Sequence, residues 1–343
     1  MKELNELIDH IKNYSGKNIK IMEVCGTHTH EIFRQGIRNI LPSSITLISG
    51  PGCPVCVTPN SFIDEAIALA LENNCTITTF GDLVRVPGSQ MSLAEARAKG
   101  AKINVVYSPL DAENYAKEHP DEQVVFLSVG FETTVPANAL SVLHAKKDGL
   151  DNYSILTSNK TMDNAYAALK DSADAFLYPG HVSVITGTAI YDRLKEEGIS
   201  GVVCGFTSHE ILSAICAIID NGETGKPFFL NCYPSVVKPE GNPAALKIIH
   251  DMMKSCDATW RGLGVIKNSG LELNDEYANF DARKKYNLRK IEGKQNPACR
   301  CGEILQGKCR PDECPCFGKN CTPEHPIGAC MVSSEGSCSA FYK

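Results

Sequence analysis

The C-terminal segment of the chain is dense in cysteine. The last 45 of the 343 residues hold eight of the sixteen cysteines, and four of those follow the spacing C-x14-C-x6-C-x16-C at Cys299, Cys314, Cys321 and Cys338. So many thiols in one short segment indicate either disulfide bridges or a bound metal. A tail of this kind folds around its cross-link, and which cross-link it uses decides whether the protein handles electrons.

Composition and charge favour the metal. The N-terminus has no apolar segment typical of a signal peptide, and no run of about 18 apolar residues is present to span a membrane. We therefore expect a cytoplasmic protein without membrane contact. Thiols stay reduced in the cytosol, so its cysteines favour metal or redox chemistry over scaffolding. The net charge of −6 argues against a nucleic-acid partner.

Short apolar, β-branched segments alternate with helical patterns. Strands are predicted at 19–24, 45–50, 76–80, 103–108, 124–129, 154–158, 175–180 and 201–206. This alternation predicts an α/β fold whose parallel sheets are covered on both faces.

A weak internal echo suggests two similar halves. Pro51-Gly52 and Pro179-Gly180 each follow an apolar strand and precede a threonine at the same offset. Strand-glycine-helix turns are common enough for this to be coincidence. If the echo is real, it predicts α/β domains at 1–120 and 121–240 that share a cleft, followed by a connector and the cysteine-rich C-terminal domain at 241–343.

The first motif with chemical potential is Cys25-Gly26-Thr27-His28, directly after the strand at 19–24. Gly26 allows a sharp exit from the strand, so Cys25 is expected close to the start of the next helix. A helix N-terminus favours the thiolate form of cysteine. His28 is near enough in sequence to share a metal with Cys25 or to accept its proton. One cysteine beside one histidine is, however, more often a buried structural pair.

The second motif is a Gly/Pro-rich turn that contains Cys53-Pro-Val-Cys56. A C-x-x-C pair in a cytosolic protein indicates a redox dithiol or half of a metal site. The spacing permits a disulfide, and the tight turn presents both sulfurs. No second C-x-x-C lies nearby to complete a zinc site, so a dithiol that exchanges two electrons is the preferred interpretation.

Two more side chains are candidates for the cleft. Glu132 lies in G-F-E-T-T between the strand at 124–129 and a helix with Pro136 in its first turn. Thr133 or Thr134 would cap that helix, but capping does not explain the carboxylate. His181 follows Pro-Gly as Cys53 does in the echo, so it is expected to face the same cleft as Cys53.

The tail allows three kinds of cross-link. Iron–sulfur clusters are held by four thiolates, and zinc also accepts four, usually through paired C-x2-4-C spacings. Because the four candidate ligands are single and widely spaced, an iron–sulfur cluster is favoured over zinc, and disulfides come last. The C-x-C pairs that include Cys301 and Cys316 keep the zinc alternative open.

In this order, the motifs closely resemble one family, the hydrogenase maturation proteins of HypD type. The similarity runs essentially from end to end, and the tail differs from the family pattern by the additional Cys309 and Cys316. The matching segments are residues 25–28 and 50–56, FGDLVRVPGS at 80–89, VGFETT at 129–134, YPGHVSVI at 178–185, WRGLGVIKNSGLEL at 260–273 and the run from CGEIL to the last cysteine.

The resemblance implies a scaffold for assembling the Fe(CN)2CO unit of [NiFe]-hydrogenases, rather than a simple turnover enzyme. Such a scaffold works with the small chaperone HypC and receives cyanide from HypE. The family's iron-binding cysteine falls on Cys25, with His28 beside it, and an accessible Cys25 would share the iron with a thiolate of HypC. The redox pair falls on Cys53 and Cys56. The [4Fe–4S] ligands of a third domain fall on Cys299, Cys314, Cys321 and Cys338.

Two other classes of protein compete with this interpretation. A free-standing thiol–disulfide oxidoreductase of the ferredoxin–thioredoxin reductase type would share the cluster and the dithiol. It would have no use for the motif at Cys25, which therefore discriminates between the two. A zinc-stapled interaction protein is the third alternative, and metal analysis would separate it.

Overall fold

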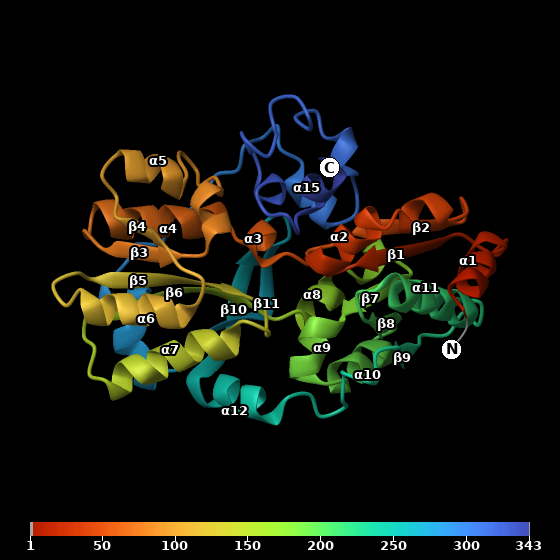
Figure 1. The fold of residues 1–343 in the computed structure, drawn as a ribbon, viewed down its shortest axis with the longest axis horizontal. Coiled ribbons are helices and arrows are strands. Elements are labelled where there is room, and N and C mark those ends of the chain that lie inside the picture. Colours follow the sequence, from red (N-terminus) through yellow and green to blue (C-terminus); the bar gives the residue numbers. More distant parts are fainter. Residues whose placement is uncertain (1–2, 343) are drawn as a thin grey trace.

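The computed structural model describes residues 3–342 and contains two separate β-sheets with a cysteine-rich tail above them (Figure 1). The five-stranded sheet is parallel throughout. Its strands, in spatial order, are β2 (Ile45–Ser49), β1 (Ile19–Glu23), β7 (Ala175–Pro179), β8 (Gly201–Cys204) and β9 (Phe229–Asn231).

The six-stranded sheet is mixed. Four of its strands, β6, β5, β3 and β4, are parallel to one another. The hairpin β10–β11 extends the sheet through antiparallel pairing of β11 with β6. In spatial order the strands are β10 (Met253–Trp260), β11 (Gly264–Leu273), β6 (Tyr153–Lys160), β5 (Val124–Gly130), β3 (Thr76–Thr79) and β4 (Ile103–Val105).

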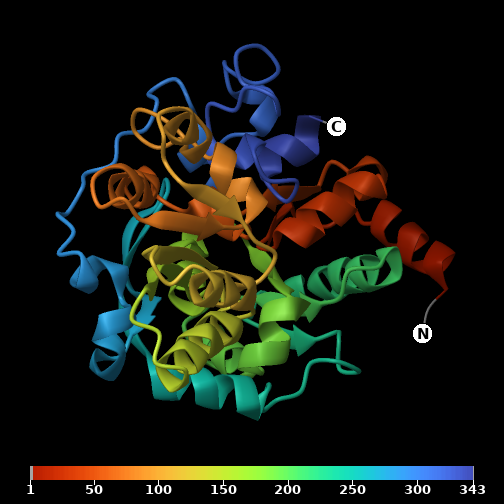
Figure 2. The same ribbon diagram turned by 60° about the vertical axis from the view of Figure 1, so that its left-hand side comes forward.

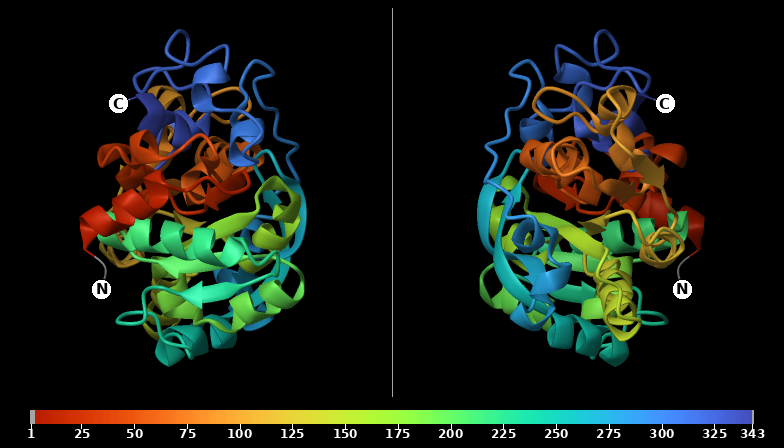
Figure 3. Two further views of the ribbon diagram at one scale, coloured as in Figure 1. Left: turned by 90° about the vertical axis from the view of Figure 1, so that its right-hand side faces the viewer. Right: turned by 90° about the vertical axis from the view of Figure 1, so that its left-hand side faces the viewer.

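Helices cover both faces of each sheet, as the apolar strands predict (Figures 2 and 3). On the five-stranded sheet, α1, α2 and α11 cover one face, and α8 and α10 the other. On the six-stranded sheet, α4 and α5 lie opposite α6 and α7. The helices are α1 (Leu4–Lys12), α2 (Gly26–Arg34), α3 (Pro54–Val57), α4 (Asn60–Leu71), α5 (Leu93–Ala98), α6 (Pro109–Glu118), α7 (Val135–Lys147), α8 (Asp163–Ala168), α9 (Gly180–Thr186), α10 (Ala189–Glu196), α11 (Ser208–Gly222), α12 (Pro243–Met252), α13 (Ala282–Lys285), α14 (Cys301–Leu305) and α15 (Ser337–Tyr342).

All eight predicted strands are present, but they are shared between the sheets differently from the predicted halves. β1 and β2 pair with β7 rather than with β3, and β3 to β6 form the other sheet. The division at residue 120 therefore does not separate the two sheets, because the chain leaves the first sheet after β2 and returns to it after β6. Strand propensity does not encode such crossings, since it marks the strands and not their partners.

The segment after residue 240 also differs from the prediction. β10 and β11 belong to the six-stranded sheet, so only the chain beyond them forms the cysteine-rich tail. Their alternation of half-exposed polar side chains with buried ones lacks the continuous apolar runs that marked the other strands. The tail folds into short helical turns, and its cysteines join Met22 of β1 and Val24, which follows that strand, in one buried cluster.

Candidate functional site

Three predicted motifs meet at the carboxyl ends of adjacent strands. Because β1 lies between β2 and β7, Cys25 is flanked by the turn to Cys53 on one side and by the turn to His181 on the other. The backbone of Gly52 packs directly on Cys25, and the Gly26 N–H donates to the Gly52 carbonyl at 3.1 Å. Carboxyl ends of parallel strands are where open α/β sheets bind ligands.

Cys25 is the N-cap residue of α2, as predicted, and its thiol is buried with 9% exposure. Burial raises the pKa of Cys25 to about 11, the Glu335 carboxylate adds to that rise, and the nearby N–H groups of His28 and Thr27 oppose it. The expectation that the helix N-terminus alone favours the thiolate is therefore outweighed by burial. The expected open access to Cys25 is also not met in this structure.

His28 is fully buried and bonded away from solvent. Its Nε2 lies 2.9 Å from the Gly205 carbonyl and 3.3 Å from Cys204 Sγ, so Nε2 carries the proton that the carbonyl accepts. Nδ1 is left buried without a hydrogen-bond partner in the described chain. Burial lowers the pKa of His28 to about 4, which keeps the imidazole neutral at physiological pH.

His181 stays at the surface above this group. The Phe206 ring stacks on both imidazoles, with centroid distances of 4.6 Å to His28 and 3.9 Å to His181. Partial burial lowers the pKa of His181, and the Glu335 carboxylate opposes that shift. His28 and His181 thus belong to one cluster beside Cys25, on neighbouring strand ends.

Glu335 is a site residue that the sequence did not reveal. It comes from the tail, and its Oε1 accepts a hydrogen bond from the Thr27 hydroxyl at 3.0 Å. A Cβ atom on Gly26 would lie 2.4 Å from the Cβ of Glu335, so only glycine allows this approach. No periodicity or spacing indicates that the segment between Cys330 and Cys338 folds back onto Cys25.

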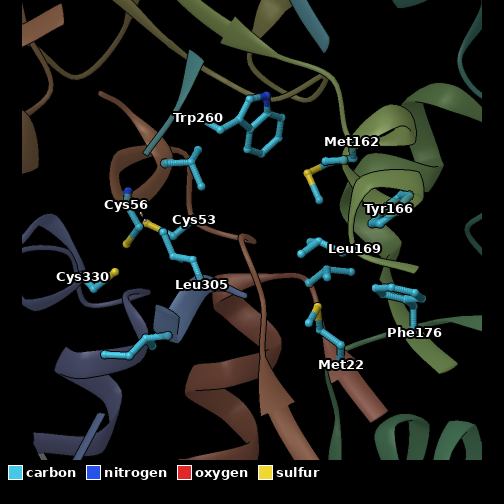
Figure 4. Packing of buried hydrophobic residues seen from close by; sticks show 14 of the residues in the cluster. Met22, Cys53, Cys56, Met162, Tyr166, Leu169, Phe176, Trp260, Leu305 and Cys330 are labelled. Carbon is cyan, nitrogen blue, oxygen red and sulfur yellow. Dashed lines mark hydrogen bonds between the residues drawn. The ribbon is translucent and has the colours of Figure 1, made fainter. Parts of the chain in front are cut away.

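The dithiol motif connects Cys25 to the tail. Cys53 is the N-cap of α3, and its sulfur accepts the Cys56 N–H at 3.4 Å. Figure 4 shows Cys56 facing Cys330 of the tail. Hydrogen bonds with the Cys330 and Cys53 sulfurs raise the pKa of Cys56, and bonds from the thiols of Cys301, Cys338 and Cys56 lower the pKa of Cys330. Cys330 therefore stands between the dithiol and the tail cysteines, a position that its spacing did not predict.

The four spaced cysteines of the tail lie around one small cavity of about 10 Å³. All sixteen cysteines lie in the described part of the chain and are free thiols. Within residues 3–342, no group of three or more His, Cys, Asp or Glu side chains is close enough to hold a single metal ion. The cavity is lined by Cys299, Cys301, Ile304, Cys314, Cys316, Phe317, Cys321, Gly328, Met331 and Cys338.

Glu132 lies at the carboxyl end of β5 in the other sheet. Its Oε1 accepts the Met162 N–H at 2.9 Å, while Oε2 is buried with no partner among the described residues. Burial raises the pKa of Glu132 to about 7. Tyr166 is close enough to both Glu132 and Cys25 for each to raise its pKa, after the larger effects of burial and Tyr191. Tyr166 therefore lies within electrostatic range of both Glu132 and Cys25.

The helices of residues 3–342 include none with the length and apolar character needed to cross a bilayer.

Comparison with known proteins gives end-to-end matches. The HypD family model, described as the hydrogenase formation hypA family, matches residues 2–343. The chain is 40% identical to hydrogenase maturation factor HypD of Rhodobacter capsulatus over 353 residues, covering 100% of the chain and 94% of that protein. It is 39% identical to HypD of Escherichia coli K12, at 100% and 94% coverage, and 40% identical to HypD of Cupriavidus necator, at 95% and 90%.

Proposed function

Because the chain belongs to the HypD family of hydrogenase formation proteins, we propose that it is the scaffold on which the Fe(CN)2CO unit of [NiFe]-hydrogenase is assembled. Its partners in this role are a small chaperone of HypC type and a cyanide donor of HypE type, and the assembly takes place in the cytoplasm. The observation that carries the proposal is the unbroken path of cysteines that starts beside Cys25, at Cys53 and Cys56, and ends at the tail cavity through Cys330.

Cys25 holds the iron that is being assembled, and His28 acts beside it. A thiolate is a soft ligand suited to low-spin iron with cyanide and carbon monoxide. The nearby N–H groups of His28 and Thr27 favour the charged form of the sulfur, and the neutral His28 retains an unprotonated Nδ1. Since Cys25 is only 9% exposed, the partner chaperone must reach it through the half-buried Thr27 and Glu335.

The tail cavity holds the [4Fe–4S] cluster through Cys299, Cys314, Cys321 and Cys338. These thiols line one small cavity, and four thiolates are the ligand set that such a cluster requires. When bound, the cluster supplies one electron at a time. Cys301 and Cys316 share the cavity wall, so they are the alternative ligands to be tested.

The dithiol stores two electrons and delivers them next to Cys25. Oxidation of Cys53 and Cys56 to a disulfide releases two electrons and two protons, and reduction of that disulfide takes up the same. Cys330 contacts Cys56 on one side and Cys301 and Cys338 on the other, so it lies on the route between the tail and the dithiol. We assign this route to reduction of the iron site or of its incoming ligand.

Glu132 and His181 handle protons around the iron, and Glu335 holds a neighbouring residue in place. A carboxyl whose pKa lies at about 7 can give or take a proton near neutral pH, and Glu132 meets that condition through burial. His181 is at the surface, where it exchanges protons with water. Glu335 accepts the Thr27 hydroxyl and thereby fixes the residue whose N–H favours the charged form of the Cys25 sulfur.

The decisive experiment is anaerobic purification of the chain with its chaperone, followed by metal analysis and infrared spectroscopy. We expect about four irons and four sulfides per tail cluster, further iron with cyanide and carbon monoxide bands, and loss of those bands in Cys25→Ala. Unchanged bands in Cys25→Ala would contradict the iron role of Cys25. Zinc without sulfide would contradict the electron route.

A second preparation separates the ligand sets of the tail. Cys314→Ser should lower the iron and sulfide content, while Cys316→Ser should leave it near the parent value. The opposite pattern would indicate that the additional cysteines, and not the four spaced ones, hold the cluster. The free-standing disulfide oxidoreductase is not favoured, because the family match covers the whole chain, including the segment around Cys25.

A further inference from the structure

Arg261 is a buried cation with no charged partner in its hydrogen bonds. It lies in the turn between β10 and β11 and is 3% exposed. The acceptors that its nitrogens find are neutral, because Nε donates to the Thr58 carbonyl at 2.8 Å and Nη1 to Asn60 Oδ1 at 2.7 Å. Nη2 is buried and has no acceptor within the described chain. Burying an uncompensated charge costs several kcal/mol, so this guanidinium requires an anion nearby.

The turn that carries Arg261 is seated on the cysteine-rich tail. Gly262 has φ +81°, and a Cβ atom there would lie 2.2 Å from Gly302 Cα, so two backbones are in contact. Gln306 Nε2 donates to the Gly262 carbonyl at 2.7 Å and fixes the same contact. Gly302 follows Cys301, which lines the cavity. Figure 1 shows the β10–β11 hairpin at the edge of the six-stranded sheet, on the side that faces the other sheet and below the tail.

The guanidinium acts on a sulfur of the cavity. Arg261 lies close enough to Cys299, which lines the cavity, for its positive charge to act on that sulfur. The same residue also holds the dithiol loop, because its backbone N–H donates to the Val57 carbonyl at 2.8 Å, one residue beyond Cys56. One positive charge therefore sits at the junction between the tail cavity and the dithiol.

We infer that Arg261 is the counter-cation of the tail cluster and a positioning residue that raises the cluster's reduction potential toward that of the dithiol. The inference rests on the proposed cluster. Four thiolates outweigh the positive charge of the iron–sulfide core, so the centre is anionic, and one electron taken from an external donor makes it more so. A buried cation stabilises the reduced form more than the oxidised form, and net charge and hydrogen bonding are recognised controls of cluster potential.

A redox titration of the full chain, loaded with cluster under anaerobic conditions, tests the inference. The reduced cluster is counted by electron paramagnetic resonance at a series of fixed potentials. At the parent's midpoint, the ratio of reduced to oxidised cluster is expected to fall about tenfold in Arg261→Gln, a shift of about 59 mV for a one-electron couple. The midpoint potential of Arg261→Lys, which keeps the charge, should lie between those of the parent and Arg261→Gln.

A second variant keeps the arginine in place in case Arg261→Gln folds poorly. Asn60→Asp puts a carboxylate on Nη1 and neutralises the charge, so it should shift the midpoint in the same negative direction. The matched control is Arg283→Gln, which removes an arginine of α13 that is already paired with Glu65 of α4 at 2.7 Å. Its midpoint should equal that of the parent.

The outcomes separate the inference from the function on which it rests. A parent chain that gains no iron and sulfide would overturn both. If the parent and the variants carry equal iron and sulfide and have the same midpoint potential, Arg261 only holds the dithiol loop in position and the inference fails. A lower midpoint in Arg261→Gln and Asn60→Asp, with Arg283→Gln unchanged, supports it.

Discussion

Gly52 and Cys25 are in backbone contact: a Cβ atom on Gly52 would lie 2.2 Å from the Cys25 nitrogen. The contact is closed by the hydrogen bond from the Gly26 N–H to the Gly52 carbonyl. A side chain at position 52 would have to displace backbone, so glycine is required there. Through this contact the dithiol loop, which starts at Cys53, is fixed in position against the proposed iron-binding thiol.

Gly52→Ala should separate the two motifs. We expect the free energy of unfolding to fall by about 1–3 kcal/mol, as for an overpacked core site, and the iron retained with the chaperone to fall with it. Urea denaturation and iron analysis measure the two effects. The matched control is Gly81→Ala, whose added Cβ would meet only Val105 Cγ1 at 3.7 Å. Equal stability of Gly52→Ala and the parent would show that the contact is not tight.

Glu335→Gln should make Cys25 more acidic. The Glu335 carboxylate contributes to raising the pKa of Cys25 above its ordinary value, whereas glutamine keeps an acceptor for Thr27 without the charge. Alkylation of Cys25, followed peptide by peptide with mass spectrometry across a pH series, should shift to lower pH. Glu324→Gln, a fully exposed tail carboxylate, is the control. Superimposable profiles for Glu335→Gln and the parent would remove Glu335 from the site.

Glu132 should make the parent less stable as pH rises toward neutrality. Its pKa is about 7 in the folded chain and 4.5 as its ordinary value, so the unfolded chain loses the proton first. The contribution of the protonated Glu132 to the free energy of unfolding is therefore complete below about pH 4.5. It decreases by up to about 3 kcal/mol as the pH rises from there to about 7. Urea unfolding at pH 5 and pH 8 should show a smaller difference for Glu132→Gln than for the parent. The exposed Glu240→Gln should behave as the parent does, and an equal pH dependence in Glu132→Gln would contradict the raised pKa.

Cys330→Ser should interrupt the electron route without emptying the tail cavity. A hydroxyl cannot take part in thiol–disulfide exchange, so reduction of a Cys53–Cys56 disulfide by the reduced tail should slow on the order of tenfold or more. Timed trapping of free thiols measures the rate, with iron content as a check on loading. Cys75→Ser changes a buried cysteine of the core of the six-stranded sheet and should leave the rate unchanged. Equal rates in Cys330→Ser and the parent would place the route elsewhere.

The eight apolar strands and the strand-end position of Cys25 follow from local pattern alone. Continuous β-branched runs are buried on both faces, and glycine after a strand permits a sharp turn, so these features depend on neighbouring residues in sequence. The hairpin β10–β11 was not predicted by the same reasoning. It joins the sheet only through the pairing of β11 with β6, and β10 at the edge has partly exposed polar residues instead of a continuous apolar run. The expectation of a thiolate at Cys25 was also wrong. The helix N-terminus that lowers the pKa of the thiol can be inferred from sequence, whereas the burial that raises it further cannot.

The sequence by itself determined the α/β class, the motifs and the four spaced cysteines of the tail, because each depends on residue type and short-range spacing. Only the tertiary structure decided that β1 pairs with β7, that Glu335 reaches Thr27, and that Cys330 and Arg261 stand between the dithiol and the tail. The physical reason is that these contacts join residues far apart in the chain. They form because apolar faces from both sheets and the tail bury one another, and no local pattern records which faces will meet.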